Sequence, residues 1–199
     1  MNLCAQEPVA APKAEGIPPR AAPTDYQFHG QAGPLTVAAE FTGHSVMTPD
    51  ATLTTEDYVV IELALYGPAG THVRISADDF TLRVNGNKKP LPAQPYGAVV
   101  SSLKDLSLVP TAEEQKSKTQ VNTGGGGRND NSPPPPYRVP DALRHQYSQQ
   151  LQKLSLPEGD RPLPTAGLIY FQYHGKTEKI QSLKLTYTGP SGHVTLELE

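Results

Sequence analysis

The side chains best suited to metal or proton chemistry in this sequence are its six histidines. None of them is spaced as HxH, HxxxH or HExxH, the patterns that present two ligands to one metal ion. His174 and His193 fall at the ends of expected strands and could meet across the end of a hairpin. An enzyme would need a cluster of titratable groups in a cleft, for which the candidates are Asp79, His72 and His174. We otherwise expect the histidines to lie exposed in turns: His29, His44, His72, His145, His174 and His193.

Two acidic clusters carry oxygen atoms that a calcium ion could use. Asp78-Asp79 falls at a break between two expected strands, and Asn129-Asp130-Asn131 falls in a stretch without apolar periodicity. A calcium loop needs several spaced oxygen ligands, and neither cluster has that spacing. We therefore expect Asp79 to cap backbone N–H groups at a corner of the chain, and we predict no metal site.

Two glycine-containing segments are similar to catalytic loops, but both lack the required neighbours. The run Gly124–Gly127 is followed by Arg128 rather than by Lys-Ser/Thr and a helix, so it fails as a phosphate loop. Gly189-Pro190-Ser191-Gly192 lacks the GxSxG spacing of a nucleophile elbow and is typical of a hairpin turn. No Ser/His/Asp triad is evident, although a triad can be assembled from distant residues. The sequence therefore predicts no catalytic, cofactor-binding or metal-binding residues, and a protein that is not an enzyme.

The composition excludes several classes of protein. Of 199 residues, 21 are Pro and 17 are Gly, well above average usage of about 12% for the two together, which argues against a helical bundle. No run approaches the roughly 18 to 20 apolar residues of a membrane helix, so we expect no membrane span. The formal net charge of −3 gives no basic field for nucleic acid. A single Cys excludes an internal disulfide framework.

The N-terminal residues 1–24 are rich in Ala and Pro and show no strand or helix period, so we expect a disordered tail. Residues 1–6 are similar to the end of a secretory signal near its cleavage point, although the charged and apolar regions of such a signal are not present. Either Met1 is not the true start, or the similarity is chance. Cys4 is an alternative acceptor for a lipid anchor, disfavoured because Leu3 stands where such sites have Gly, Ala or Ser. An exposed thiol without a role is the remaining interpretation.

From residue 25 the apolar residues alternate with period two, the pattern of half-buried strands. Turns rich in Gly and Pro separate the alternating runs at intervals of about ten residues, which is typical of an antiparallel β-sandwich, here of about seven strands. Asn85-Gly86 predicts a tight turn, and the prolines that follow it predict an edge segment. The expected strands are 35–41, 57–66, 73–75, 80–84, 167–174, 180–187 and 194–198.

An insertion over residues 101–162 interrupts this pattern. Its first part, 104–137, lacks periodicity and is expected to be a long disordered loop or linker. Within it, Pro133–Tyr137 (PPPPY) matches the ligands of aromatic-grooved modules, but a stiff linker is the favoured interpretation. A helix is expected over 140–154, packed across an opening of the sandwich or over a sheet edge. Its apolar stripe consists of Leu143, Tyr147, Leu151 and Leu154.

The order YVVIELALYG, DDFTLRVNG, GLIYFQY, IQSLKLTY and HVTLELE resembles the immunoglobulin-like domains of unknown function found on bacterial secreted proteins and lipoproteins. The likeness covers residues 57–99 and 163–199 and leaves the insertion outside. It implies a place outside the cytoplasm and a binding or structural role. The matching positions are Val60, Leu63, Asp79, Phe80, Leu82, Gly86, Gly167, Phe171, Leu183 and Tyr187.

Three functions are consistent with these observations. The first is a non-catalytic immunoglobulin-like module, periplasmic or secreted, that binds a protein or glycan partner at the bacterial cell envelope. The second is a structural or assembly subunit that pairs an edge strand with another subunit. The third and least favoured is a hydrolase. The sequence leaves the partner and the oligomeric state open.

Overall fold

The computed structural model describes residues 14–48, 51–105 and 141–198, which form a mostly β structure with one long helix. An antiparallel, predominantly β fold with one inserted helix is thereby confirmed. No helix of these ranges is long and apolar enough to cross a membrane. The helices are α1 (Tyr96–Val100) and α3 (Asp141–Leu154), and the 3-10 turns are η1 (Pro23–Asp25), η2 (Ala77–Asp79) and η4 (Thr177–Lys179). The strands are β1 (Phe28–Ala32), β2 (Leu35–Phe41), β3 (Ser45–Met47), β4 (Thr52–Thr55), β5 (Tyr58–Tyr66), β6 (His72–Ile75), β7 (Phe80–Val84), β8 (Leu91–Gln94), β9 (Leu103–Asp105), β10 (Gly159–Pro162), β11 (Thr165–Gln172), β12 (Leu183–Gly189) and β13 (Gly192–Leu198).

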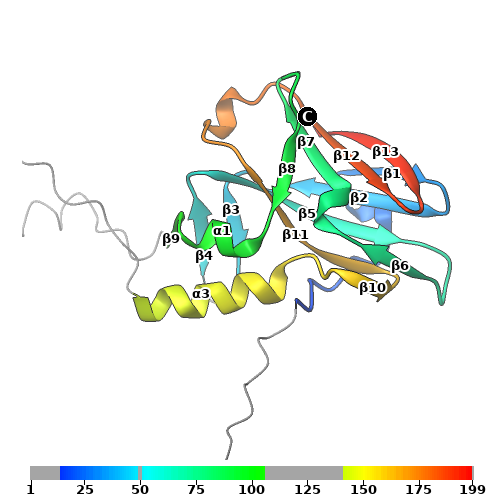
Figure 1. Ribbon diagram of the computed structural model, residues 1–199, viewed down its shortest axis with the longest axis horizontal. Coiled ribbons are helices and arrows are strands. Elements are labelled where there is room, and N and C mark those ends of the chain that lie inside the picture. Colours follow the sequence, from blue (N-terminus) through cyan, green and yellow to red (C-terminus); the bar gives the residue numbers. More distant parts are fainter. Residues whose placement is uncertain (1–13, 49–50, 106–140, 199) are drawn as a thin grey trace, which may run out of the picture.

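Eight strands form one antiparallel sheet in the order β1-β2-β5-β11-β8-β7-β12-β13. The sheet curls until its outermost strands, β1 and β13, lie against each other (Figure 1). Gly30 of β1 permits this approach, because a Cβ atom there would meet Val194 and Leu196 at 2.9 and 2.8 Å. The curled sheet encloses the main apolar core, which includes Phe80, Phe171 and other fully buried side chains.

Strand β11 divides its side chains between two apolar cores. It pairs with β5 over all eight of its residues. Because side chains alternate along a strand, Ile169 and Phe171 enter the main core, whereas Leu168 and Tyr170 point to the opposite face and enter a second core. The strand is buried on both faces, which explains its nearly continuous apolar sequence.

Helix α3 covers the outer face of the sheet and closes the second core. The predicted helix is confirmed at Asp141–Leu154, and its stripe residues Tyr147 and Leu151 are buried. They pack with Val60, Leu168 and Tyr170 from the sheet, and the small sheet β3-β4-β9 and α1 contribute further apolar side chains. The expected position over an opening or an edge is therefore corrected to a sheet face (Figure 1).

Strand β8 lies inside the sheet, so the edge position predicted from its prolines is wrong. It pairs with β7 through Leu91 and Pro92 and with β11 through Ala93 and Gln94. Each pairing is only two residues long, so the absence of an N–H group at Pro92 costs few of the hydrogen bonds between the strands. The tight turn before it is confirmed, since Asn85 and Gly86 have φ values of 51° and 66°.

Both ends of the predicted insertion join the fold. Residues 103–105 form β9 beside β4, and residues 159–162 form β10 beside β6. The expected kink between 75 and 80 is the 3-10 turn η2, which directs β6 to β10 and β7 to the main sheet. Residues 106–140, including most of the predicted linker, lie outside the described residues.

The N-terminal segment differs from the tail expected over 1–24, because residues 14–24 are held by the fold. The backbone N–H of Gly16 donates to the carbonyl of Lys153 at the end of α3, and that of Ile17 to the carbonyl of Ala166. The guanidinium of Arg20 lies over the ring of Tyr26 at 4.3 Å. Ile17 also packs against the second core. The spacing of apolar residues did not reveal this segment, because most of its attachments are backbone hydrogen bonds and polar contacts. Residues 1–13, with Cys4 and the signal-like residues, lie outside the described residues.

Replacing Arg20 with Met should lower the free energy of unfolding by about 1 kcal/mol, because Arg20 separates two facing carboxylates. Glu40 and Glu62 are opposite each other on β2 and β5, and Arg20 lies 2.5 Å from the first and 3.4 Å from the second. Urea unfolding at low and high salt measures the change. In an E62Q background the cost should fall by about half. An R20M effect that neither salt nor E62Q reduces would contradict this role.

Candidate functional site

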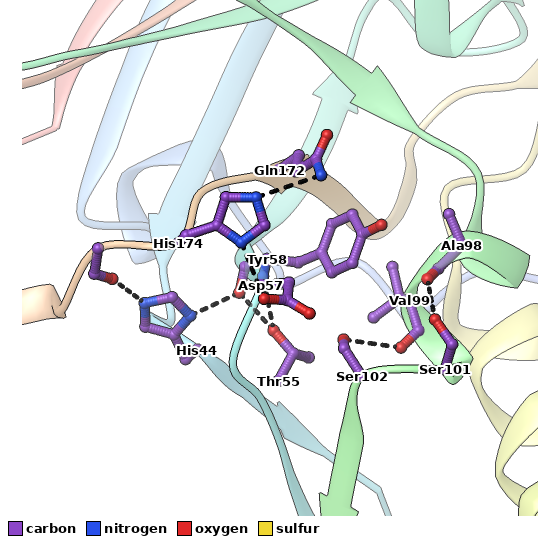
Figure 2. Close-up of polar contacts among 11 residues, drawn as sticks. His44, Thr55, Asp57, Tyr58, Ala98, Val99, Ser101, Ser102, Gln172 and His174 are labelled. Carbon is purple, nitrogen blue, oxygen red and sulfur yellow. Dashed lines mark hydrogen bonds and ion pairs between the residues drawn. The ribbon is translucent and has the colours of Figure 1, made fainter.

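Where β11 leaves the sheet, His174, Asp57 and Gln172 form a polar group that we call the His174 cluster. Nδ1 of His174 lies 2.8 Å from Oδ1 of Asp57, and Nε2 lies 3.3 Å from the side-chain nitrogen of Gln172 (Figure 2). The amide nitrogen can only donate, so Nε2 of His174 accepts, and Nδ1 carries the proton and donates to the carboxylate. The pair is an oriented imidazole of the kind that general acid–base chemistry uses, but the side chains are 66% and 47% exposed.

His44 lies beside the His174 cluster and fastens three segments of the chain together (Figure 2). Its Nδ1 lies 2.7 Å from the carbonyl oxygen of Tyr58, and its Nε2 lies 2.9 Å from that of Gly175. The ring also stacks on Tyr173 with centroids 6.3 Å apart. Both carbonyls only accept, so the neutral ring donates to one of them and the imidazolium ion donates to both. This residue holds the turn after β11 against the start of β5.

The serine and threonine hydroxyl groups drawn in Figure 2 are engaged with backbone carbonyls. Ser101 and Ser102, at the end of α1, donate to the carbonyls of Ala98 and Val99 at 3.0 and 2.9 Å (Figure 2). Thr55 donates to the carbonyl of Tyr58 at 2.5 Å. Nucleophilic catalysis needs a hydroxyl hydrogen-bonded to the base. Among the hydrogen bonds of the described residues, none joins His174 to a hydroxyl.

The other candidate residues lie at separate places in the fold. His174 and His193, which could have met across the end of a hairpin, lie on different elements: His193 is in β13 opposite Thr188, and His174 bonds Asp57. His72 lies 3.5 Å from Asp160 across β6 and β10. His29 is in β1 and His145 is on α3, and both are exposed.

The capping role predicted for Asp79 is confirmed. Its carboxylate accepts the backbone N–H of Ser76 at 3.3 Å, at the start of η2. Partial burial raises the pKa of Asp79. No ion pair or hydrogen bond of the described ranges joins Asp79, His72 and His174. Within those ranges no three His, Cys, Asp or Glu side chains are grouped to hold a metal ion. The segments 124–127, 129–131 and 133–137 lie outside the described residues.

A pocket of about 600 Å³ lies between η2, the end of β8, β11 and the segment that follows α3. Its volume is within the range of small-molecule sites, roughly 300 to 1,000 Å³. Strand β11 contributes three neighbouring residues, so both faces of that strand border the space. Its lining is mainly apolar, with charged groups from η2 and from residues 158–161. The lining residues are Ala14, Ala77, Asp78, Ala93, Gln94, Pro95, Tyr96, Ser155, Leu156, Glu158, Arg161, Leu168, Ile169 and Tyr170.

Two buried hydroxyl groups among the lining residues are satisfied by the protein itself. Ser155 donates to the carbonyl of Leu151 at 2.6 Å, and the hydroxyl oxygens of Ser155 and Tyr170 lie 3.4 Å apart. Tyr170 is 1% exposed and Ser155 9%. Burial raises the pKa of Tyr170 well above its ordinary value. These groups add polarity to the pocket without leaving an uncompensated charge in it.

Residues 158–161 are tied to η2 by one hydrogen bond and are braced internally by a second. A carboxylate oxygen of Glu158 accepts the backbone N–H of Ala77 at 2.9 Å, and Nε of Arg161 donates to the carbonyl of Glu158 at 2.9 Å. Asp78 adds an exposed carboxylate. The polar side of the pocket is therefore preorganised and carries charge of both signs.

In three comparisons with known proteins, no family model, no curated protein and no solved structure matches the chain. The site is therefore assigned from its geometry. The sequence did not reveal the pocket, because its walls come from five separate segments. One usable signal was the change from helical to extended pattern after Leu154, which places Ser155 and Leu156 beside β11.

Alkaline pH should destabilise the fold, because several tyrosines keep their protons more tightly when folded. Burial raises the pKa of Tyr66 and Tyr170, and the Tyr66 hydroxyl also donates to the carbonyl of Arg20 at 2.8 Å. The unfolded chain loses these protons near pH 10. The contribution of these tyrosines to the free energy of unfolding is therefore fully present below about pH 10 and decreases above it. Urea unfolding between about pH 8 and about pH 11 measures the decline, and Y170F should reduce it. A stability that stays constant across this range would contradict the assignment.

Proposed function

We propose that this chain is a non-catalytic binding module of the bacterial cell envelope, built as an immunoglobulin-like sandwich. In this proposal the pocket beside β11 receives an apolar group of a protein or glycan partner. The observation that carries the proposal is the pocket of about 600 Å³ with its mainly apolar lining. Such a site gains affinity from apolar burial, and the charged groups at 158–161 orient the partner.

The His174 cluster supports a non-catalytic role in this proposal. Its imidazole and carboxylate are exposed, and the neighbouring serines are bonded to carbonyls of α1. A hydrolase would need one of these hydroxyls to turn toward His174. Location outside the cytoplasm rests on the signal-like residues 1–6, and fractionation of the native host tests it. Recovery of the unprocessed chain in the cytoplasm would overturn that part of the proposal.

A pocket-filling substitution tests the binding role. The neutral apolar fluorophore N-phenyl-1-naphthylamine serves as the probe, with binding followed by its fluorescence. Ala77 borders the pocket, so A77W should weaken binding by at least about tenfold. The matched control is A69W, at an exposed turn outside the pocket, and it should bind like the original protein. Equal binding by both variants, or no saturable binding by the original chain, would overturn the proposal.

A second candidate is assembly through an edge strand, favoured by one observation. Strand β3 is the outer strand of the sheet β3-β4-β9, and its Met47 is 76% exposed. Unpaired strand edges pair readily with other chains. This role predicts an oligomer that M47K disrupts, measured by sedimentation velocity, whereas the binding module alone predicts no effect of M47K on mass.

A further inference from the structure

One end of the molecule concentrates positive charge on two loops that are distant in sequence. The turn after β7 carries Lys88 and Lys89, and the segment around η4 carries Lys176 and Lys179 (Figure 1). All four lysines are exposed. With Arg83 and Lys184 on the adjoining strands, they form a surface that we call the basic end.

The side chain of Asn85 locks the two loops of the basic end together. Its amide nitrogen donates to the carbonyl of Lys179 at 3.0 Å, and its amide oxygen accepts the backbone N–H groups of Gln181 and Ser182 at 2.7 and 3.2 Å. The backbone N–H of Asn85 also donates to the carbonyl of Ser182 at 2.8 Å. The lysines are therefore held near one another by the fold rather than by chance orientations of free loops.

The basic end contains a pairing of like charges that costs stability. Arg83 of β7 is directly opposite Lys184 of β12, and like charges in that relation destabilise a sheet. Glu197 pairs with Lys184 at 2.5 Å and leaves Arg83 without an ion-pair partner among the described residues. Within 83–89 and 174–184, Glu178 is the only acidic residue. A net positive surface is thus maintained on a chain whose formal net charge is −3.

The chemistry of the basic end fits a broad anionic surface. Five of its six cations are lysines, which act as point charges rather than as bidentate forks. Residues 83–89 and 174–184 contain no Phe, Tyr or Trp on which nucleic-acid bases could stack. None of the residues of the basic end lines the apolar pocket. Exposed lysines of this kind are attracted to anionic lipid headgroups.

We propose that the basic end docks this protein peripherally on an anionic phospholipid surface. Each lysine near such a surface adds about 1 kcal/mol, which corresponds to about fivefold in partitioning. The four lysines on the loops make the closest approach, and Arg83 and Lys184 extend the field along the sheet. This inference does not rest on the pocket or on its ligand.

Sedimentation with vesicles tests the docking surface on the full chain. Vesicles of equal parts phosphatidylglycerol and phosphatidylcholine should bind the protein, and raising NaCl from about 0.05 M to about 0.5 M should release it. K88Q/K89Q should lower the partition coefficient by about 25-fold, and K176Q/K179Q by a similar factor. The matched control, R144Q/K153Q, removes two cations from α3 and should change it less than about twofold. Circular dichroism establishes that each variant is folded.

Several results would overturn the proposal. They are binding to pure phosphatidylcholine as strong as to the mixed vesicles, no binding to the mixed vesicles, or equal losses for the loop and α3 variants. A fluorescent polyphosphate or single-stranded oligonucleotide that binds at least as tightly as the mixed vesicles would assign the surface to a soluble polyanion instead. A77W should lose probe binding and keep normal vesicle binding, whereas K88Q/K89Q should lose vesicle binding and keep probe binding. Each proposal can therefore fail without the other.

Discussion

Replacing Gly167 with Ala is expected to lower the free energy of unfolding by about 3 kcal/mol, although it adds only one methyl group. Gly167 lies in β11 beneath the segment that follows α3. A Cβ atom there would come within 2.5 Å of the nitrogen of Leu156 and 2.7 Å of the carbonyl carbon of Ser155. These are backbone atoms, so no side-chain rotation relieves the contact. The segment must move away and lose the hydrogen bond from the Leu156 N–H to the carbonyl of Leu168, which is 2.9 Å long.

The matched control for this substitution is Gly97→Ala. Gly97 lies in α1, and a Cβ atom there would have no neighbour within 4 Å. Ala is also the better helix former, so G97A should be neutral or stabilising by up to about 1 kcal/mol. Urea unfolding of both variants gives the comparison. Equal stabilities for G167A and G97A would show that residues 155–156 do not lie on β11 as described.

Replacing Phe171 with Ala should cost about 3 to 5 kcal/mol, because Phe171 fills the centre of the main core. Its side chain is fully buried, and its strand is paired on both sides, with Val59 of β5 and Ala93 of β8 opposite it. The surrounding strands cannot close the resulting cavity without breaking those ladders. Thermal and urea unfolding should both report the loss.

Two further variants keep the Phe171 prediction falsifiable if F171A does not fold. F171L retains most of the volume and should cost only about 1 kcal/mol. F28A removes the same atoms from a half-buried position on the outer strand β1 and should cost much less than F171A. An F171A protein as stable as F28A would place Phe171 outside the main core.

The parts of the fold that the sequence predicts are those in which apolar residues recur with the spacing of a strand or a helix. The β5 and β11 strands appear as alternating or continuous apolar runs, and Asn85-Gly86 has the conformation that its residue types favour. Helix α3 was predicted to the residue at its C-terminal end, because Leu143, Tyr147, Leu151 and Leu154 share one face. The spacing of apolar residues does not say which core a helix face enters, so the sequence predicts the helix over an opening or an edge, whereas it lies on a sheet face.

The short elements could not be predicted, because strands such as β9 and β10 have only three or four residues and acquire their structure from partners distant in sequence. The same holds for the segment 14–24, whose Gly and Pro content is typical of a free tail. It is held instead by the end of α3 and by the facing carboxylates of Glu40 and Glu62.

The candidate sites could be predicted from the sequence even less well than the fold. The absence of a metal site stays a prediction for the whole chain. His174 was singled out, but its partner Asp57 is 117 positions away and follows no motif. The pocket depends on η2, β8 and residues 155–161 meeting beside β11, which is a property of topology alone. Likewise, the basic end exists because Asn85 joins two loops nearly a hundred residues apart.

The most direct test of the binding proposal is to locate the bound probe by NMR. Nuclear Overhauser effects between N-phenyl-1-naphthylamine and the isotope-labelled protein identify the methyl groups in contact with it. We predict contacts to the methyl groups of Leu156, Leu168 and Ile169, which line the pocket. Contacts confined to Met47 and its neighbours on β3, with none to the pocket methyls, would contradict the account.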